Sequence, residues 1–206
     1  MQGFALYPFH PPGDVAALRA ELRAWLAVNQ PQGDIVARAN CWASFDSDFS
    51  RALGAAGYVG MTLPTRYGGG DRHPLERYVV IEELLAAGAP VGAHWIADRQ
   101  TGPLIVRYGS EEQRERYLPG IVRGELYACI GLSEPGAGSD LAAVRTTARE
   151  TTEGWRINGQ KIWTTGAHFS HIMLALVRTE EGSERNAGLS QLLIDLDTPG
   201  ITIRPI

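Results

Sequence analysis

Apolar residues in the first half of the chain recur at intervals of three and four positions, the spacing of one face of an α-helix. Leu18, Leu22 and Leu26 follow this pattern after Asp14, a residue type that often caps helix N-termini. The same spacing, together with proline, glycine and capping-box signals, predicts further helices. They are expected around 45–53, from Pro74 to about Leu85, over 92–99, from Pro103 towards Tyr108, and from Ser110 onward.

After Gly124 the apolar pattern changes to alternation, which is the period of a half-buried β-strand. Glu153 and Gly154 separate two of the alternating runs and predict a hairpin turn. Helices followed by strands predict an α+β protein, with an all-helical domain over residues 1–124 and an antiparallel, barrel-like β domain over residues 125–206 whose sheet is incomplete. The strands are expected at 127–132, 144–149, 155–158, Ile162, 171–179, 189–196 and 201–205.

Composition narrows the class of protein. Hydrophobic residues make up 44% and charged residues 20% of the chain, as in ordinary globular proteins, and the net charge of −4 gives no reason to expect nucleic acid. Cys41 and Cys129 lie far apart, and His168 and His171 fall where a loop enters a strand, so neither pair predicts a metal site. No signal peptide and no membrane span is recognised, and a cytoplasmic protein is expected.

Two sequence blocks carry the candidate chemistry. Block 132–140 reads Leu-Ser-Glu-Pro-Gly-Ala-Gly-Ser-Asp, and block 160–165 reads Gln-Lys-Ile-Trp-Thr-Thr. The first brings backbone amides and small hydroxyls close to a ligand, and the second offers a ring face and two donors, a combination that suits a flat aromatic cofactor with polar edges. Taken separately, the blocks have plainer interpretations: a hairpin turn for the first, and core packing of Trp163 with the β preference of threonine for the second.

Both blocks resemble the flavin-binding middle domain of the acyl-CoA dehydrogenase family. Residues 63–70, 82–84 and 108–114 resemble parts of that family's N-terminal domain, so the resemblance runs from about residue 14 to residue 206. It implies FAD as cofactor, an acyl-CoA thioester as substrate in fatty acid metabolism, an electron-transfer flavoprotein as acceptor, and a homo- or hetero-oligomer. In the family a base removes the α-proton of the thioester and the β-hydride passes to FAD.

The resemblance also implies roles for individual residues. Trp163 is expected to stack on the flavin ring, Thr165 to reach its hydride-accepting nitrogen, and Thr164 to add a backbone contact. Ser139 is expected at the FAD pyrophosphate or the CoA arm, which also makes it a substrate-binding candidate. The full set of expected cofactor-binding residues is Ile130, Gly131, Leu132, Ser133, Gly138, Ser139, Trp163, Thr164 and Thr165.

No residue of the chain matches the catalytic base of the family. The resemblance places that base in a C-terminal helical domain that we expect to be absent from these 206 residues, so no catalytic residue is assigned and the chain is expected to be inactive alone. Glu82 and Glu83 are interpreted as a salt-bridged patch rather than an acid–base pair. Two other functions stay open: a non-catalytic partner subunit of a hetero-oligomeric dehydrogenase, and a flavin-dependent monooxygenase or oxidase on the same scaffold.

Overall fold

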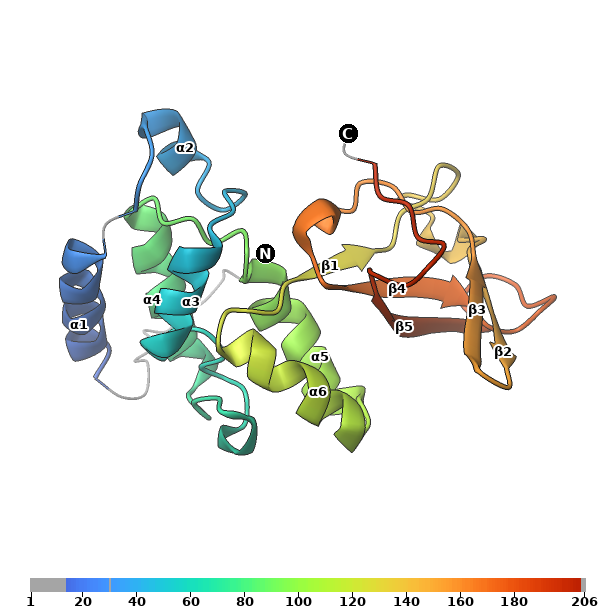
Figure 1. Ribbon diagram of the computed structural model, residues 1–206, viewed down its shortest axis with the longest axis horizontal. Helices are drawn as coiled ribbons and strands as arrows, with labels where there is room; N and C mark the ends of the chain where they lie inside the picture. The colour runs from blue at the N-terminus through green and yellow to red at the C-terminus, as the bar shows by residue number, and fades with distance from the viewer. Residues whose placement is uncertain (1–13, 30, 205–206) are drawn as a thin grey trace, which may run out of the picture.

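The helices come first along the chain and the strands follow. In the computed structural model, which describes residues 14–29 and 31–204, the two groups lie side by side (Figure 1). The helices are α1 (Val15–Val28), α2 (Ile35–Ala39), α3 (Ser47–Ala55), α4 (Pro74–Ala86), α5 (Gly102–Tyr108) and α6 (Glu111–Val122). The strands are β1 (Ala128–Gly131), β2 (Thr147–Thr151), β3 (Gly154–Asn158), β4 (Ile172–Arg178) and β5 (Leu189–Asp195).

Two of the predicted helix starts are confirmed by their capping bonds. The carboxylate of Asp14 accepts a hydrogen bond of 2.9 Å from the amide of Ala17 and so opens α1. Ser110 and Gln113 exchange side-chain and backbone bonds in a capping box at the start of α6. Each cap satisfies amides that a helix cannot satisfy within itself.

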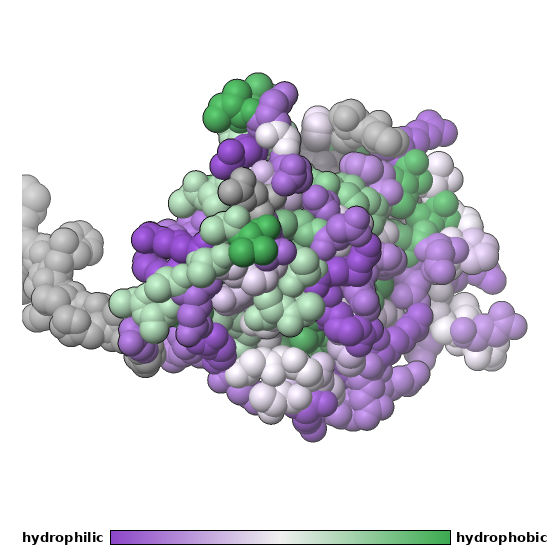
Figure 2. Space-filling view, turned by 60° about the vertical axis from the view of Figure 1, so that its left-hand side comes forward, coloured by the Kyte–Doolittle hydropathy of each residue, from purple (hydrophilic) through white to green (hydrophobic). Residues whose placement is uncertain are grey.

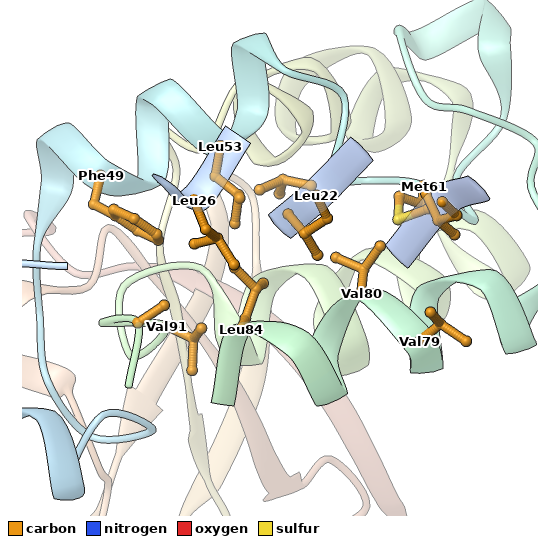
Figure 3. Close-up of a cluster of buried hydrophobic side chains, with 12 residues drawn as sticks. Leu22, Leu26, Phe49, Leu53, Met61, Val79, Val80, Leu84 and Val91 are labelled. Atoms are coloured by element: carbon orange, nitrogen blue, oxygen red, sulfur yellow. The ribbon is translucent and has the colours of Figure 1, made fainter. Parts of the chain in front are cut away.

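The apolar face predicted for α1 is buried against α3 and α4. Leu22 is fully buried, and Figure 3 shows it together with Leu26, near Leu53 of α3 and with Val80 of α4 below. Burying one such side chain contributes about 1.5–3 kcal/mol, so this cluster is the main support of the helical part.

Ion pairs reinforce the same helix pair at its rim. The guanidinium of Arg23 donates to Glu83 Oε2 at 2.7 Å, and Arg19 donates to both Glu82 and Glu83. The two carboxylates therefore form a salt-bridged patch between α1 and α4, as interpreted from the sequence.

The helix expected over 92–99 and the one expected from Pro103 join into one irregular segment. A π-helix spans Ala97–Thr101 and leads directly into α5, with Pro103 in the first turn of α5. Because the π-helix runs into α5 without a break, Pro103 removes one backbone hydrogen bond from a continuous helical segment. The π-helix was not predicted, since apolar spacing does not distinguish one widened turn from an ordinary one.

α2 was also not predicted, because five residues are too few to show a helical period. Its N-cap, Asp34, accepts from the amides of Val36 and Ala37 at 3.0 and 2.9 Å. The apolar side chains of Ile35 and Val36 remain 79% and 72% exposed, and Figure 2 shows hydrophobic surface at the top of the molecule, where α2 lies in Figure 1.

A second core joins the helices to the sheet. Leu118 and Ile121 of α6 pack with Ala128 of β1 and Ile172 of β4, and all four are buried. This shared core fixes where β1 leaves the helical part, and therefore where the segment that follows β1 begins. The domain limits of 1–124 and 125–206 stay a prediction.

β4 is the centre of the sheet. β5 pairs with it antiparallel along one edge, while β1 and β2 lie one after the other along its opposite edge, both parallel to it. β3 pairs antiparallel with β2 through the predicted turn at Glu153 and Gly154. The α+β class is confirmed, but the sheet is mixed rather than purely antiparallel, and the described strands do not close into a barrel.

Three expected strands differ from the structure. β2 begins at Thr147 rather than at residue 144, because residues 141–143 form a 3-10 turn. Ile162 is not in a strand, since the next residue, Trp163, has a φ of +56°, which no strand accommodates. Residues 201–204 make no strand either: the amide of Ile201 donates to the carbonyl of Thr198, which turns the chain instead of pairing it. Residue 205 lies outside the described residues.

Candidate cofactor site

The site begins where the chain leaves the central strand. β1 pairs with β4 as far as Gly131 and Ala175, and β2 rejoins the same edge of β4 at Thr147 and Arg178. Residues 132–146 therefore form an excursion from the sheet edge. Within it, Glu134 and Ala137 bond each other's backbone at 2.8 and 3.1 Å, which makes a tight turn.

The second block lies directly against the start of this excursion. The amide of Ile162 donates to the carbonyl of Ser133 at 2.9 Å. The ammonium of Lys161 donates to the carbonyl of Leu132 at 3.1 Å and to the carboxylate of Glu134 at 2.8 Å. Two segments that lie almost thirty residues apart in the sequence are thus brought together, as a shared cofactor site requires.

Glu134 is buried and carries a charge. Burial by itself raises the pKa of its carboxyl group, but hydrogen bonds from Lys161, Thr146 and the amide of Arg145 outweigh burial and lower that pKa to about 2. Glu134 is therefore a carboxylate at neutral pH. Sequence reasoning missed both Glu134 and Lys161, although Lys161 is the only lysine of the chain and both residues lie within the motif blocks.

Trp163 faces outward. Its side chain is 69% exposed, so core packing, the plainer interpretation of this residue, does not hold. Its φ of +56° lies in the left-handed region, which costs a residue with a Cβ atom of order 1–3 kcal/mol and tends to occur at functional sites. The amide of Thr165 closes this bend by donating to the carbonyl of Trp163 at 3.0 Å. An exposed ring on a strained bend is available to stack on a ligand.

The glycines of the first block differ in what requires them. A Cβ atom on Gly131 would come within 2.5 Å of the sulfur of Met173, so packing inside the protein already favours glycine there. A Cβ atom on Gly138 would meet nothing within 4 Å, and the backbone of Gly138 has no left-handed φ. Nothing in the chain itself requires glycine at 138. This fits the close approach of a ligand.

The remaining predicted residues lie around the same edge. Residues 130 and 131 end β1, and residues 132 and 133 follow it. The other edge of β1 is paired with no strand of the described part, so backbone groups there can serve a ligand, while the carbonyls of Leu132 and Ser133 already accept from Lys161 and Ile162. Ser139 is exposed on the excursion, next to Asp140, which forms an ion pair of 3.2 Å with Arg185. Thr164 is half-buried, and its hydroxyl lies 3.5 Å from the carbonyl of Ile162.

Arg178 holds the far side of the excursion and was also not predicted. Its guanidinium donates to the carbonyls of Ala142 and Val144 on the excursion at 3.1 and 3.4 Å. It also donates to the carbonyls of Ser183 and Ala187 in the loop between β4 and β5, at 3.2 and 2.9 Å. One side chain therefore links the excursion, which carries Ser139, to the loop between β4 and β5.

Two surface hollows lie beside the blocks. The smaller, of about 260 Å³, lies against the tight turn. The larger, of about 420 Å³, lies between α6, the end of β5 and residues 167–171. The smaller hollow is lined by Gln160 of the second block, and neither hollow is lined by Trp163, Thr164 or Thr165.

Neither a metal-binding cluster nor a membrane-spanning helix is found among the described residues. Residues 14–29 and 31–204 hold no group of three or more histidine, cysteine or acidic side chains that could bind a metal. Among the helices of the same ranges, none is both long and apolar enough to cross a membrane.

Comparison with known proteins matches both parts of the chain. A model described as the acyl-CoA dehydrogenase N-terminal domain matches residues 14–125, and one described as the middle domain matches residues 129–206. The acyl-CoA dehydrogenase IpdE1 of Mycobacterium tuberculosis is 40% identical over 201 residues, which are 94% of this chain and 52% of IpdE1.

Solved structures agree. The Tcur3481-Tcur3483 steroid ACAD superposes with a TM-score of 0.84 at 32% identity, covering 96% of this chain and 51% of that one. The ChsE4-ChsE5 complex of M. tuberculosis gives 0.77 at 31% identity, with 92% and 49% covered. A glutaryl-CoA dehydrogenase of Mycobacterium smegmatis in complex with FADH2 gives 0.79 at 27% identity, with 95% and 49% covered.

The chain therefore belongs to the acyl-CoA dehydrogenase family, as the two sequence blocks indicate. It spans about half the length of the relatives and structures that it matches.

Proposed function

We propose that this chain forms the flavin-binding part of an acyl-CoA dehydrogenase that introduces a double bond between the α and β carbons of an acyl-CoA thioester. FAD, when bound, accepts the hydride from the β carbon, and an electron-transfer flavoprotein takes up the electrons. The observation that carries the proposal is the bond between Ser133 and Ile162, which brings the loop block and the tryptophan block to one edge of the sheet.

The chain's own share of the work is binding and orientation. Backbone groups of residues 130–133 would bond the polar rim of the flavin, and the exposed ring of Trp163 would cover one face of it. Thr165 and Thr164 would meet the ring from the same bend, and Gly138 and Ser139 would lie along the phosphates or the CoA arm. These assignments rest on the resemblance to the family and on the positions just described.

The proposal names the substrate as an acyl-CoA thioester and does not specify its acyl group. The name of one structural neighbour describes a steroid enzyme and that of another a glutaryl-CoA enzyme, so fatty acyl, steroid-derived and dicarboxylic acyl thioesters form the panel to be tested. The stretch around His94 and Thr101, which resembles the acyl pocket of the family, is where we expect selectivity to arise.

The flavin role is tested by replacing the ring that would stack. In protein that retains flavin, Trp163→Ala should weaken FAD binding by roughly 0.5–1.5 kcal/mol, about 2- to 13-fold in Kd, because the stacking contact is lost. Fluorescence titration with FAD measures the change. Trp155→Ala is the matched control, since Trp155 is also exposed and lies on β3 of the same sheet. Equal Kd values for the parent and Trp163→Ala would remove the stacking role.

A second candidate is a partner subunit in a hetero-oligomer. The observation that favours it is the name of a structural neighbour, which describes a complex of two components, ChsE4 and ChsE5. Purification of the native protein from its own cells, followed by mass spectrometry of the intact assembly, separates the two candidates. A second, different chain in stoichiometric amount supports the partner role, and copies of one chain alone count against it.

A further inference from the structure

The carboxylate of Glu134 joins the two ends of the excursion, residues 134 and 145–146, which we call its neck. Its Oε2 accepts from the amide of Arg145 at 2.6 Å and its Oε1 from the amide of Thr146 at 2.9 Å. Residue 134 lies near the start of the excursion, and residues 145 and 146 lie at its end, just before β2. A single side chain thus fixes both ends of the segment that carries Gly138 and Ser139.

Lys161 extends this closure to the second block. Its ammonium bonds the same Oε1 at 2.8 Å and the carbonyl of Leu132 at 3.1 Å. Beside it, the amide of Ile162 bonds the carbonyl of Ser133. The residue after Ile162 is Trp163, whose backbone is held in the left-handed region. The position of the exposed ring therefore depends on how Lys161 is anchored.

The buried ion pair of Glu134 and Lys161 adds little to the free energy of unfolding. The side chains of Glu134 and Lys161 are only 8% and 7% exposed, and burying two charges carries a desolvation penalty that their mutual attraction often fails to exceed. Apolar residues of similar size would stabilise a core as well or better. Both carboxylate oxygens and the ammonium nitrogen, however, bond groups of the two blocks or of the end of the excursion, and apolar residues would make none of these bonds.

We propose that Glu134 and Lys161 are positioning residues that hold the two blocks in the arrangement that receives the flavin. The proposal rests on the proposed flavin role of those blocks. Neither side chain needs to touch the cofactor; each acts through the backbone that it bonds. The pair resembles the outer groups that orient the ligands of other cofactor sites, and misplacement of about 1 Å in such a site is enough to weaken it.

The test compares Glu134→Gln, Lys161→Met and the double variant. Each single variant leaves one buried charge without its partner and should lower the melting temperature. The double variant removes both charges and should recover most of that loss. In the double variant we nevertheless expect FAD to bind at least about tenfold more weakly, because the bond to Leu132 is lost and a side-chain amide, with one acceptor oxygen instead of two, cannot hold the amides of Arg145 and Thr146 as the carboxylate does.

Hydrogen exchange of flavin-free protein gives a readout that needs no cofactor. The amides of Ile162 and Thr165 should exchange at least about tenfold faster in the double variant than in the parent, each compared at an equal distance below its own melting temperature. Val177→Ala is the control for general destabilisation, since Val177 is fully buried in β4 and bonds neither block. Arg149→Gln removes an exposed ion pair of the same sheet, that with Glu181, and should change neither readout.

Two outcomes overturn the proposal. One is parental FAD affinity and parental exchange in the double variant. The other is an equal loss of FAD affinity in Val177→Ala, which would make the pair merely structural. FAD affinity is compared in preparations that retain flavin. If no preparation of the parent binds FAD, including one purified with a partner chain, the flavin role fails, whereas faster exchange at Ile162 and Thr165 would still show that the pair holds the two blocks together.

Discussion

Burial keeps His94 uncharged. Its ring is 5% exposed and lies 3.1 Å, through Nδ1, from the hydroxyl of Ser50, in the segment that leads into the π-helix. Desolvation lowers the pKa of His94 from 6.5 to about 4, because no acidic partner compensates for the loss of water around the charged form. Between pH 6.5 and pH 4, His94 is therefore protonated in the unfolded chain but stays neutral in the folded chain.

This difference predicts a loss of stability in mild acid. A depressed pKa in the folded state gives stability that is complete above pH 6.5 and that falls as the pH drops towards 4. Between pH 7 and pH 5 the contribution of His94 to the free energy of unfolding should fall by about 2 kcal/mol. Urea denaturation of the parent and of His94→Gln at both pH values isolates this contribution from that of buried acids such as Asp98. His168→Gln, at an exposed histidine, is the control, and equal pH slopes in the parent and His94→Gln would contradict the prediction.

Single residues also mark the limit of sequence reasoning at the site. The motif blocks identified Trp163 and Gly138, and the structure exposes both. Glu134 and Lys161 were not singled out, because their importance arises from a contact across 27 positions that no local pattern reveals. A charged residue inside a motif is usually interpreted as solvated, and burial is what changes its meaning.

At the scale of elements, alternation found the strands but not their partners. β1, β3, β4 and β5 lie close to where the pattern placed them, yet the pattern carries no information on whether neighbours run parallel. β1 and β2 lie in line along one edge of β4 because the excursion between them leaves that edge and returns to it. The alternating apolar residues Ile201 and Ile203 predict a half-buried strand. This segment forms no strand, because the amide of Ile201 bonds the carbonyl of Thr198 in a turn.

The other edge of β5 is left unpaired among the described strands, and an unpaired strand edge favours self-association. At the two ends of the β4–β5 pair, the amide of Leu196 bonds the carbonyl of His171 and the amide of Thr179 bonds that of Gly188. In an antiparallel pair every second residue bonds the partner strand, so the amide of Leu192 points towards β4 and the amide of Gln191 points away from it. Gln191→Pro should therefore lower self-association of the 206-residue chain without unfolding it, as sedimentation velocity would show. Leu192→Pro should unfold the sheet. Equal self-association of the parent and Gln191→Pro would exclude this edge.

The whole molecule places the sheet edge that we propose receives the flavin beside a group of helices, while its carboxylates near the two blocks are poorly suited to proton abstraction. Glu134 has a pKa of about 2, and the oxygens of its carboxylate already accept from three donors, so it is too weak and too enclosed to act as a base. Asp140 is exposed and paired with Arg185. A general base has to lie within hydrogen-bond reach of the proton that it takes, and it contributes about 10²–10⁴-fold to the rate.

We therefore expect the polypeptide of these 206 residues alone not to oxidise acyl-CoA, and to hold little flavin, because about half the length of its relatives is not represented in it. The assay is reduction of a dye by purified chain with added FAD and the panel of fatty acyl, steroid-derived and dicarboxylic thioesters, beside a full-length relative such as IpdE1. Flavin occupancy measured by absorbance should be low in the same samples. Turnover close to that of the relative would mean that a base lies within these residues, and Glu134→Gln and Asp140→Asn would then be the first variants to locate it.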